Sequence, residues 1–186
     1  VVARQLRTVP SDLVLHTGDV AYPSGSDARI EETVFDVYAD LFATVPFFPA
    51  LGNHDVETDD GAPFRRAYAL PSAGPADARF EERAYAFDWG PLHVAVLDST
   101  QDLEAQVRWL DGDLSATDRP WVIVVLHHPP YSSGHHGSSE SRRAALAPVL
   151  GRHRVPLVLS AHDHHYERSV PLDGTTYVVT GGGGTE

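Results

Sequence analysis

The amino-acid sequence predicts an α/β domain with a layered, mixed sheet core. Short β-branched runs alternate with segments of helical periodicity, as in domains where helices cover a sheet. Several of these runs are almost continuously apolar, which is typical of strands covered on both faces. The runs in residues 84–97 read as a hairpin around Trp89-Gly90-Pro91, so the sheet is expected to contain antiparallel as well as parallel strands.

The elements follow one another along 186 residues, a length that suits one domain. Apolar stripes predict helices from Ile30 to Leu41 and from Leu103 to Leu114. A third helix is expected over residues 141–150, with Gly151 as its terminator. Residues 71–83 and 132–139 read as loops. The predicted strands are residues 13–16, 47–51, 84–88, 92–97, 121–126, 157–160 and 176–180.

The composition narrows the possible chemistry. The chain has eleven histidines and no cysteine, so a metal would be held by nitrogen and oxygen, which favours Fe, Mn, Zn or Mg. Its net charge of −12 argues against a nucleic-acid-binding surface. No apolar run approaches the roughly 20 residues that span a bilayer. The chain has no methionine, and we expect sequence to be missing at both ends.

Four predicted strands run directly into polar clusters at their carboxyl ends. Asp19 follows the first strand, Asn53 the second, His127 the fifth, and the pair His162 and His164 the sixth. In α/β sheets, ligands gather outside the carboxyl ends of strands, so these clusters are expected to converge. Each cluster alone has an ordinary structural interpretation as a turn, a helix cap or a strand-end histidine. Their joint occurrence favours a metal site.

The residue types fit a centre of two metal ions. The carboxylate of Asp19 has two oxygens and can bridge two cations, and neutral imidazoles suit Zn, Fe and Mn. Two such cations can polarise a phosphoryl group and activate water. If the backbone at His162 and His164 is extended, both rings lie on one face, so that each could serve one metal.

These motifs resemble the calcineurin-like metallophosphoesterase superfamily and, within it, the purple acid phosphatases. The resemblance covers the chain from about residue 12 to its end and implies an αββα sandwich with mixed sheets. It identifies residues 1–186 as a single catalytic domain, truncated at both ends. The matching motifs are Gly18-Asp19-Val20-Ala21-Tyr22, Gly52-Asn53-His54-Asp55, Val125-Leu126-His127 and Ala161-His162-Asp163-His164-His165-Tyr166-Glu167-Arg168.

The resemblance implies a role for each matching residue. Asp19 would bridge the metals, while Tyr22 and His164 would bind ferric iron. The second metal, Fe(II), Zn or Mn, would be held by Asn53, His127 and His162.

The resemblance also supplies residues for the substrate. Together with Asn53, His54 would contact the phosphate, and it would also assist the leaving group. His135 and His136 resemble histidines that line the substrate pocket, and the sequence leaves open which of the two faces substrate. His136 is taken with His54 as a catalytic residue. Other histidines, such as His128, are interpreted as structural or exposed. Asp55 and Asp163 are expected to support the neighbouring ligands.

Two departures from the family pattern stand out. The family has a further metal-binding aspartate upstream of Gly18-Asp19, and nothing in residues 1–11 matches it. We attribute its absence to truncation. Ala161 stands where many members have glycine, which matters only if the backbone there needs a positive φ.

The expected activity is that of a hydrolase, an acid-phosphatase-like enzyme that cleaves phosphate monoesters at two metals. One alternative is a phosphodiesterase or nucleotide hydrolase of the same superfamily. Another is a non-catalytic domain that binds metal or phosphate, if the upstream aspartate is truly missing. The expected ligand is a small phosphate ester or phosphate. Family habit suggests a secreted or periplasmic protein, and the sequence does not indicate the oligomeric state.

Overall fold

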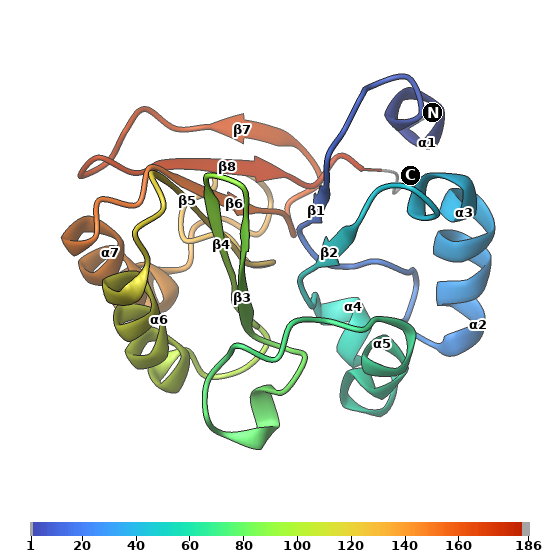
Figure 1. Cartoon of the computed structure of the whole chain (residues 1–186), viewed down its shortest axis with the longest axis horizontal. Helices are drawn as coiled ribbons and strands as arrows, with labels where there is room; N and C mark the ends of the chain where they lie inside the picture. The colour runs from blue at the N-terminus through green and yellow to red at the C-terminus, as the bar shows by residue number, and fades with distance from the viewer. Residues whose placement is uncertain (1, 184–186) are drawn as a thin grey trace.

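The computed structural model describes residues 2–183 and shows four layers in the order helix, sheet, sheet, helix. The smaller sheet pairs β1 (Val14–His16) with β2 (Phe47–Pro49) in parallel. Figure 1 shows these two strands between the large sheet and the helices on the right of the view. The predicted αββα sandwich with mixed sheets is therefore confirmed.

The larger sheet has six strands in the order β3-β4-β5-β6-β8-β7. Its four inner strands run parallel, and the two edge strands, β3 and β7, run antiparallel to their neighbours. The predicted hairpin is confirmed, because Trp89 pairs with Leu92 across the turn. The strands are β3 (Tyr85–Trp89), β4 (Leu92–Val96), β5 (Trp121–Val125), β6 (Leu157–Ser160), β7 (Tyr166–Arg168) and β8 (Thr176–Thr180).

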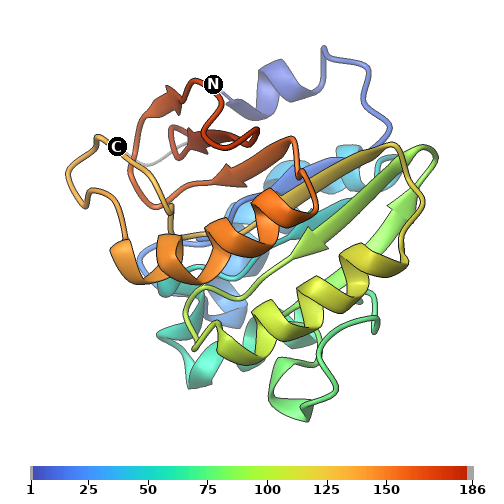
Figure 2. The same ribbon diagram turned by 90° about the vertical axis from the view of Figure 1, so that its left-hand side faces the viewer.

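Three apolar clusters hold the layers together. Helices α6 (Glu104–Ala116) and α7 (Glu140–Arg152) cover the outer face of the large sheet, where Leu110 and Leu146 pack on Val124 (Figure 2). A second cluster lies between the two sheets and includes Tyr85, Val94 and Val96. Burial of apolar area on both faces explains why these strands read as continuous apolar runs.

The third cluster fixes the helices on the small sheet. Helix α2 (Asp27–Ile30), a π-helical stretch (Glu31–Phe35) and α3 (Asp36–Phe42) form one continuous helical segment. Ile30 and Val34 from this segment pack with Phe64 of α5 (Ala62–Ala67) and with Leu51 beyond β2. Ile30 and Val34 of the predicted stripe are thus buried, whereas Val37 is 36% exposed. The helical segment begins at Asp27, three residues before the stripe.

Several short elements were not predicted. They are α1 (Val2–Leu6), α4 (Asn53–Val56), α5, the 3₁₀ turns Asp59–Gly61 and Ala78–Phe80, and strand β7. Strand β7 was missed because it is a short edge strand with exposed polar side chains and follows the histidine cluster directly. Gly151 does not end its helix, as α7 continues to Arg152, so that prediction was wrong. None of the described helices is long and apolar enough to cross a membrane.

Candidate metal centre

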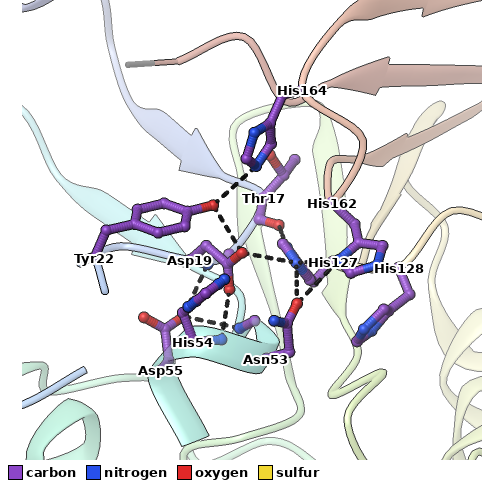
Figure 3. A network of polar contacts seen from close by, with 12 residues as sticks. Thr17, Asp19, Tyr22, Asn53, His54, Asp55, His127, His128, His162 and His164 are labelled. Carbon is purple, nitrogen blue, oxygen red and sulfur yellow. Dashed lines mark hydrogen bonds and ion pairs between the residues drawn. The ribbon is translucent and has the colours of Figure 1, made fainter. Parts of the chain in front are cut away.

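Asp19 lies in the loop that leaves β1, in the seam between the two sheets. Its backbone is left-handed, with φ of 55°, a conformation that a residue with a Cβ atom adopts at an energetic cost. The carboxylate Oδ1 accepts the backbone N–H of His54 at 2.9 Å, which leaves Oδ2 directed toward Tyr22 and His127 (Figure 3). Strain at this position therefore aims one carboxylate oxygen at two of the predicted ligands.

Asp55 holds the loops after β1 and β2 together. Its buried carboxylate accepts three backbone N–H groups, from Asp19, Val20 and Gly52, at 2.8–2.9 Å. Burial raises the pKa of Asp55 to about 7, whereas the three N–H donors favour its charged form. Gly52 has to be glycine here, since a Cβ atom would lie 2.1 Å from Oδ1 of Asp19. Asp55 thus supports the neighbouring ligand loop as predicted.

His127 presents a lone pair to a group of acceptors. Its Nδ1 lies 2.8 Å from the Thr17 carbonyl, which can only accept, so Nδ1 carries the proton. The opposite ring nitrogen, Nε2, then faces Oδ1 of Asn53 at 3.1 Å, Oδ2 of Asp19 at 3.2 Å and Nδ1 of His162 at 3.3 Å. Nδ1 of His162 is itself 2.9 Å from the same Asn53 oxygen.

This cluster of acceptor atoms fits a metal ion. Lone pairs that face one another at about 3 Å repel unless a proton or a cation lies between them. The pKa of His162 is lowered to about 4, mainly by burial, so this ring does not hold a second proton near neutral pH. Nitrogen and oxygen donors of this kind suit a divalent Fe, Zn or Mn ion.

Tyr22 contacts the same Asp19 oxygen, Oδ2, that faces His127, and it joins this oxygen to His164. The Tyr22 hydroxyl donates to Oδ2 of Asp19 at 2.9 Å and lies 3.2 Å from Nε2 of His164. Burial raises the pKa of Tyr22, and the negative charge of Asp19 raises it further. A phenolate at this position therefore needs a strong positive charge beside it. Burial alone would raise the pKa of the Asp19 carboxyl, but the pKa is lowered, and the backbone N–H of His54 and the Tyr22 hydroxyl are among the donors that lower it.

His162 and His164 reach their two groups by a turn rather than by an extended backbone. His162 has φ of 65°, and residues 162–165 form bends between β6 and β7. The expectation that an extended i, i+2 pair presents both rings was therefore wrong, since the turn directs one ring to His127 and the other to Tyr22 (Figure 3). Ala161 is not among the described residues with positive φ, so its difference from glycine carries no strain.

His128 is a component that sequence reasoning set aside. Ligand atoms of His127, His128 and His162 lie within 4.8 Å of one another, and the His128 ring centroid is 4.4 Å from that of His162. The hydroxyl of Ser99 lies 2.9 Å from Nδ1 of His128, and burial lowers the pKa of His128 to about 3. Its position directly after His127 was the signal, because both residues lie in the irregular segment beyond β5.

The three substrate histidines occupy different places. Nδ1 of His54 donates to the Pro23 carbonyl at 2.6 Å, and the His54 ring lies 4.5 Å from the Tyr22 ring. His136 packs its ring 4.2 Å from that of His162. His135 is next to it, with 5.2 Å between the two ring centroids. Both residues are exposed, and it is His136 whose ring contacts the predicted metal ligand.

A cavity of about 640 Å³ adjoins these residues. Asp19, Tyr22, His162 and His164 contribute to its wall, together with apolar side chains of β1, α3 and β2. Five of the six predicted metal ligands, all but Asn53, thus line an accessible space of the size that small-molecule sites occupy.

The model of the family described as "Calcineurin-like phosphoesterase" matches residues 2–166. "Purple acid phosphatase 21" of Arabidopsis thaliana is 32% identical over 203 residues, 97% of this chain and 45% of that protein. "Probable inactive purple acid phosphatase 24" from the same plant is 29% identical over 216 residues, 94% of this chain and 34% of that protein.

A solved structure gives the same picture at the level of the fold. Purple acid phosphatase PPD1 from yellow lupin (Lupinus luteus) seeds superposes with a TM-score of 0.84 at 22% identity, covering 98% of this chain and 38% of that one. The chain therefore spans less than half the length of these similar proteins.

Proposed function

Because the chain belongs to the calcineurin-like phosphoesterase family, we propose that it hydrolyses phosphate monoesters at a centre of two metal ions, in the manner of an acid phosphatase. In this proposal residues 1–186 form part of a single catalytic domain, and the substrate is a small phosphate ester. The likeness to the purple acid phosphatases also supports a secreted or periplasmic protein.

One observation carries the proposal. Nε2 of His127 lies within 3.3 Å of Oδ1 of Asn53, Oδ2 of Asp19 and Nδ1 of His162. With the His127 proton on Nδ1, its Nε2 lone pair faces two oxygen acceptors, those of Asn53 and Asp19. A divalent Fe, Zn or Mn ion held by these residues would relieve the repulsion. Asp19 would share its carboxylate with a ferric ion held by Tyr22 and His164, since Oδ2 of Asp19 also accepts from Tyr22.

The protein's own groups would orient the ester and move the proton. When bound, the two cations supply charge for the phosphoryl oxygens and lower the pKa of water. Nδ1 of His54 donates its proton to the Pro23 carbonyl, which leaves Nε2 as the nitrogen that can carry a second proton. His54 would donate this Nε2 proton to the oxygen of the leaving group. The His136 ring, whose centroid lies 4.2 Å from that of His162, would bind a phosphoryl oxygen, with Asn53 and His135 as further substrate contacts.

Two other functions are tested alongside this one. A phosphodiesterase or nucleotide hydrolase would use the same metal ligands, and a panel of monoester and diester substrates separates the two activities. A non-catalytic metal-binding or phosphate-binding domain is suggested by residues 1–11, where nothing matches the further metal-binding aspartate that the family resemblance implies. Metal analysis together with the activity assay separates this function from the enzymatic ones.

The decisive experiment replaces Asp19 by Asn in the full chain and measures metal content and turnover of an aryl phosphate. We expect loss of both, because the amide lacks the charge that a bridging ligand needs. Asp12→Asn, an exposed aspartate just before β1, is the matched control and should retain both. Retained metal and unchanged turnover in Asp19→Asn would refute the assignment.

A further inference from the structure

Asp163 lies between the predicted metal ligands His162 and His164, yet its carboxylate bonds to another part of the chain. The residue is 1% exposed. Its Oδ2 accepts the hydroxyl of Ser132 at 2.5 Å, and its Oδ1 accepts the backbone N–H of His136 at 2.8 Å. Asp163 therefore binds the loop of residues 132–138, which carries the two candidate substrate histidines.

The fit between Asp163 and this loop is close. Gly134 sits against the carboxylate, so that a Cβ atom at position 134 would lie 2.5 Å from Cγ of Asp163. The N–H of Gly134 also donates to the Ser132 hydroxyl at 3.0 Å, which fixes the direction of that hydroxyl's proton. A loop that only passed near Asp163 would not need both a glycine and an oriented donor at this position.

A second carboxylate joins the same two segments. Oε2 of Glu167 in β7 accepts the backbone N–H of Ser133 at 2.7 Å and its hydroxyl at 3.0 Å. The ring Nε2 of His165 lies 3.1 Å from the same oxygen. The loop of residues 132–138 is thus hydrogen-bonded both to Asp163 in the turn and to Glu167 in β7.

These hydrogen bonds fix the position of the His136 ring. The N–H that Asp163 accepts belongs to His136 itself, and the centroid of the His136 ring lies 4.2 Å from that of His162, with the two rings tilted by 37°. Buried hydrogen bonds to a charged acceptor are the stronger kind, and they pin the backbone from which the ring projects. The position of His136 relative to the metal ligand is therefore set by Asp163.

We propose that Asp163 is a positioning residue that fixes the His136 loop against the metal ligand His162, and so sets the affinity for the phosphate group rather than for the metal. The inference rests on the proposed phosphatase function for its catalytic meaning. It replaces the expectation that Asp163 supports its neighbouring ligands directly. The sequence could not show this, because the direction of a side chain in a turn is decided by tertiary contacts.

The test compares Asp163→Ala and Ser132→Ala with the parent protein in the full chain loaded with metal. We expect KM for a small aryl phosphate to rise about tenfold in Asp163→Ala, the effect of losing hydrogen bonds to a buried charge. Metal content and kcat should change little. Ser132→Ala should shift KM in the same direction by less, and the double variant should be less than additive because the two side chains share one bond. Glu140→Ala, an exposed acid beyond the same loop, is the control.

Hydrogen exchange provides a readout that does not depend on activity. The amides of residues 134–138 should exchange faster in Asp163→Ala, while those of β6 keep their protection. If the parent protein binds metal but does not turn over the ester, the proposed function fails. The affinity for inorganic phosphate then replaces KM in the same comparison. Loss of metal to the extent seen in His162→Ala would overturn the inference. So would unchanged substrate or phosphate affinity, or unchanged exchange, in Asp163→Ala.

Discussion

Two buried histidines in this protein illustrate opposite uses of the same side chain. His93 in β4 is 6% exposed, and its two ring nitrogens lie 2.8 Å from carboxylate oxygens of Asp88 and Asp113. Carboxylates only accept, so both nitrogens donate and the ring is an imidazolium. The pKa of His93 is raised, first by the hydrogen bond to Asp113 and also by that to Asp88, against the effect of burial.

His127 after β5 is 1% exposed, and its Nδ1 has one acceptor, the Thr17 carbonyl at 2.8 Å. Its other nitrogen, Nε2, is shared by Asn53, Asp19 and His162 at 3.1–3.3 Å, and a single proton there could be donated to only one of them. The comparison teaches that burial does not mark the functional histidine. A completed set of hydrogen bonds identifies a structural histidine, whereas converging lone pairs identify a candidate ligand.

Replacing His127 and His93 in separate variants is the strongest test of the distinction between them. His127→Ala should lower turnover of an aryl phosphate by more than about 100-fold, the upper range for partners of metal ligands, and should lower metal content. His93→Gln should keep both within error of the parent protein. Steady-state kinetics and metal analysis on the two variants check this, and equal losses in both would contradict the distinction.

The pH dependence of the free energy of unfolding tests the structural role of His93. His93→Gln should lower the free energy of unfolding by about 1–3 kcal/mol at pH 6, because Asp113 loses its charged donor. The pKa of His93 is raised above its ordinary 6.5, so its contribution is complete below 6.5 and is lost as the pH rises through the folded-state pKa.

Urea unfolding of the parent protein and the variant between pH 5 and 9 measures that difference. The gap between the two free energies should narrow as the pH rises. A gap that stays constant would mean that the Gln variant loses packing rather than charge.

The smallest expected effect concerns Tyr22, whose hydroxyl joins Asp19 to His164. The iron-loaded parent protein should absorb visible light, as the family resemblance implies for a tyrosinate bound to ferric iron. Tyr22→Phe should be colourless at equal iron content, with turnover reduced by about tenfold. A visible spectrum with metal analysis is the measurement. Unchanged colour would remove Tyr22 from the ligand set and leave the His127 group untouched.

The sequence predicted those parts of the fold that follow from apolar periodicity. Strands 157–160 and 176–180 match β6 and β8, because a buried strand needs apolar side chains along its whole length. The meeting of Asp19, Asn53, His127 and His162 was also predictable, since each follows a strand whose carboxyl end reaches one edge. Strand β7 was not, because an exposed edge strand carries no such pattern.

Side-chain directions in the loops lay beyond prediction. The turn at His162, the placement of His128 beside the ligands and the attachment of Asp163 to residues 132–138 all depend on contacts between distant segments. Helix α4 begins at Asn53 for a similar reason, because Asp55 fixes the turn that precedes it by accepting the N–H of Gly52. Local propensity describes none of these contacts.

The hydrogen bond from His127 to the Thr17 carbonyl joins residues 110 positions apart, and the contact between His162 and Asn53 spans 109. Closing such long loops costs chain entropy before any contact repays it, so these contacts are expected to form late in folding. An ion that needs all of them therefore finds its ligands only on a chain that has already folded. Metal binding would then stabilise the folded chain and slow its unfolding. It would not speed folding.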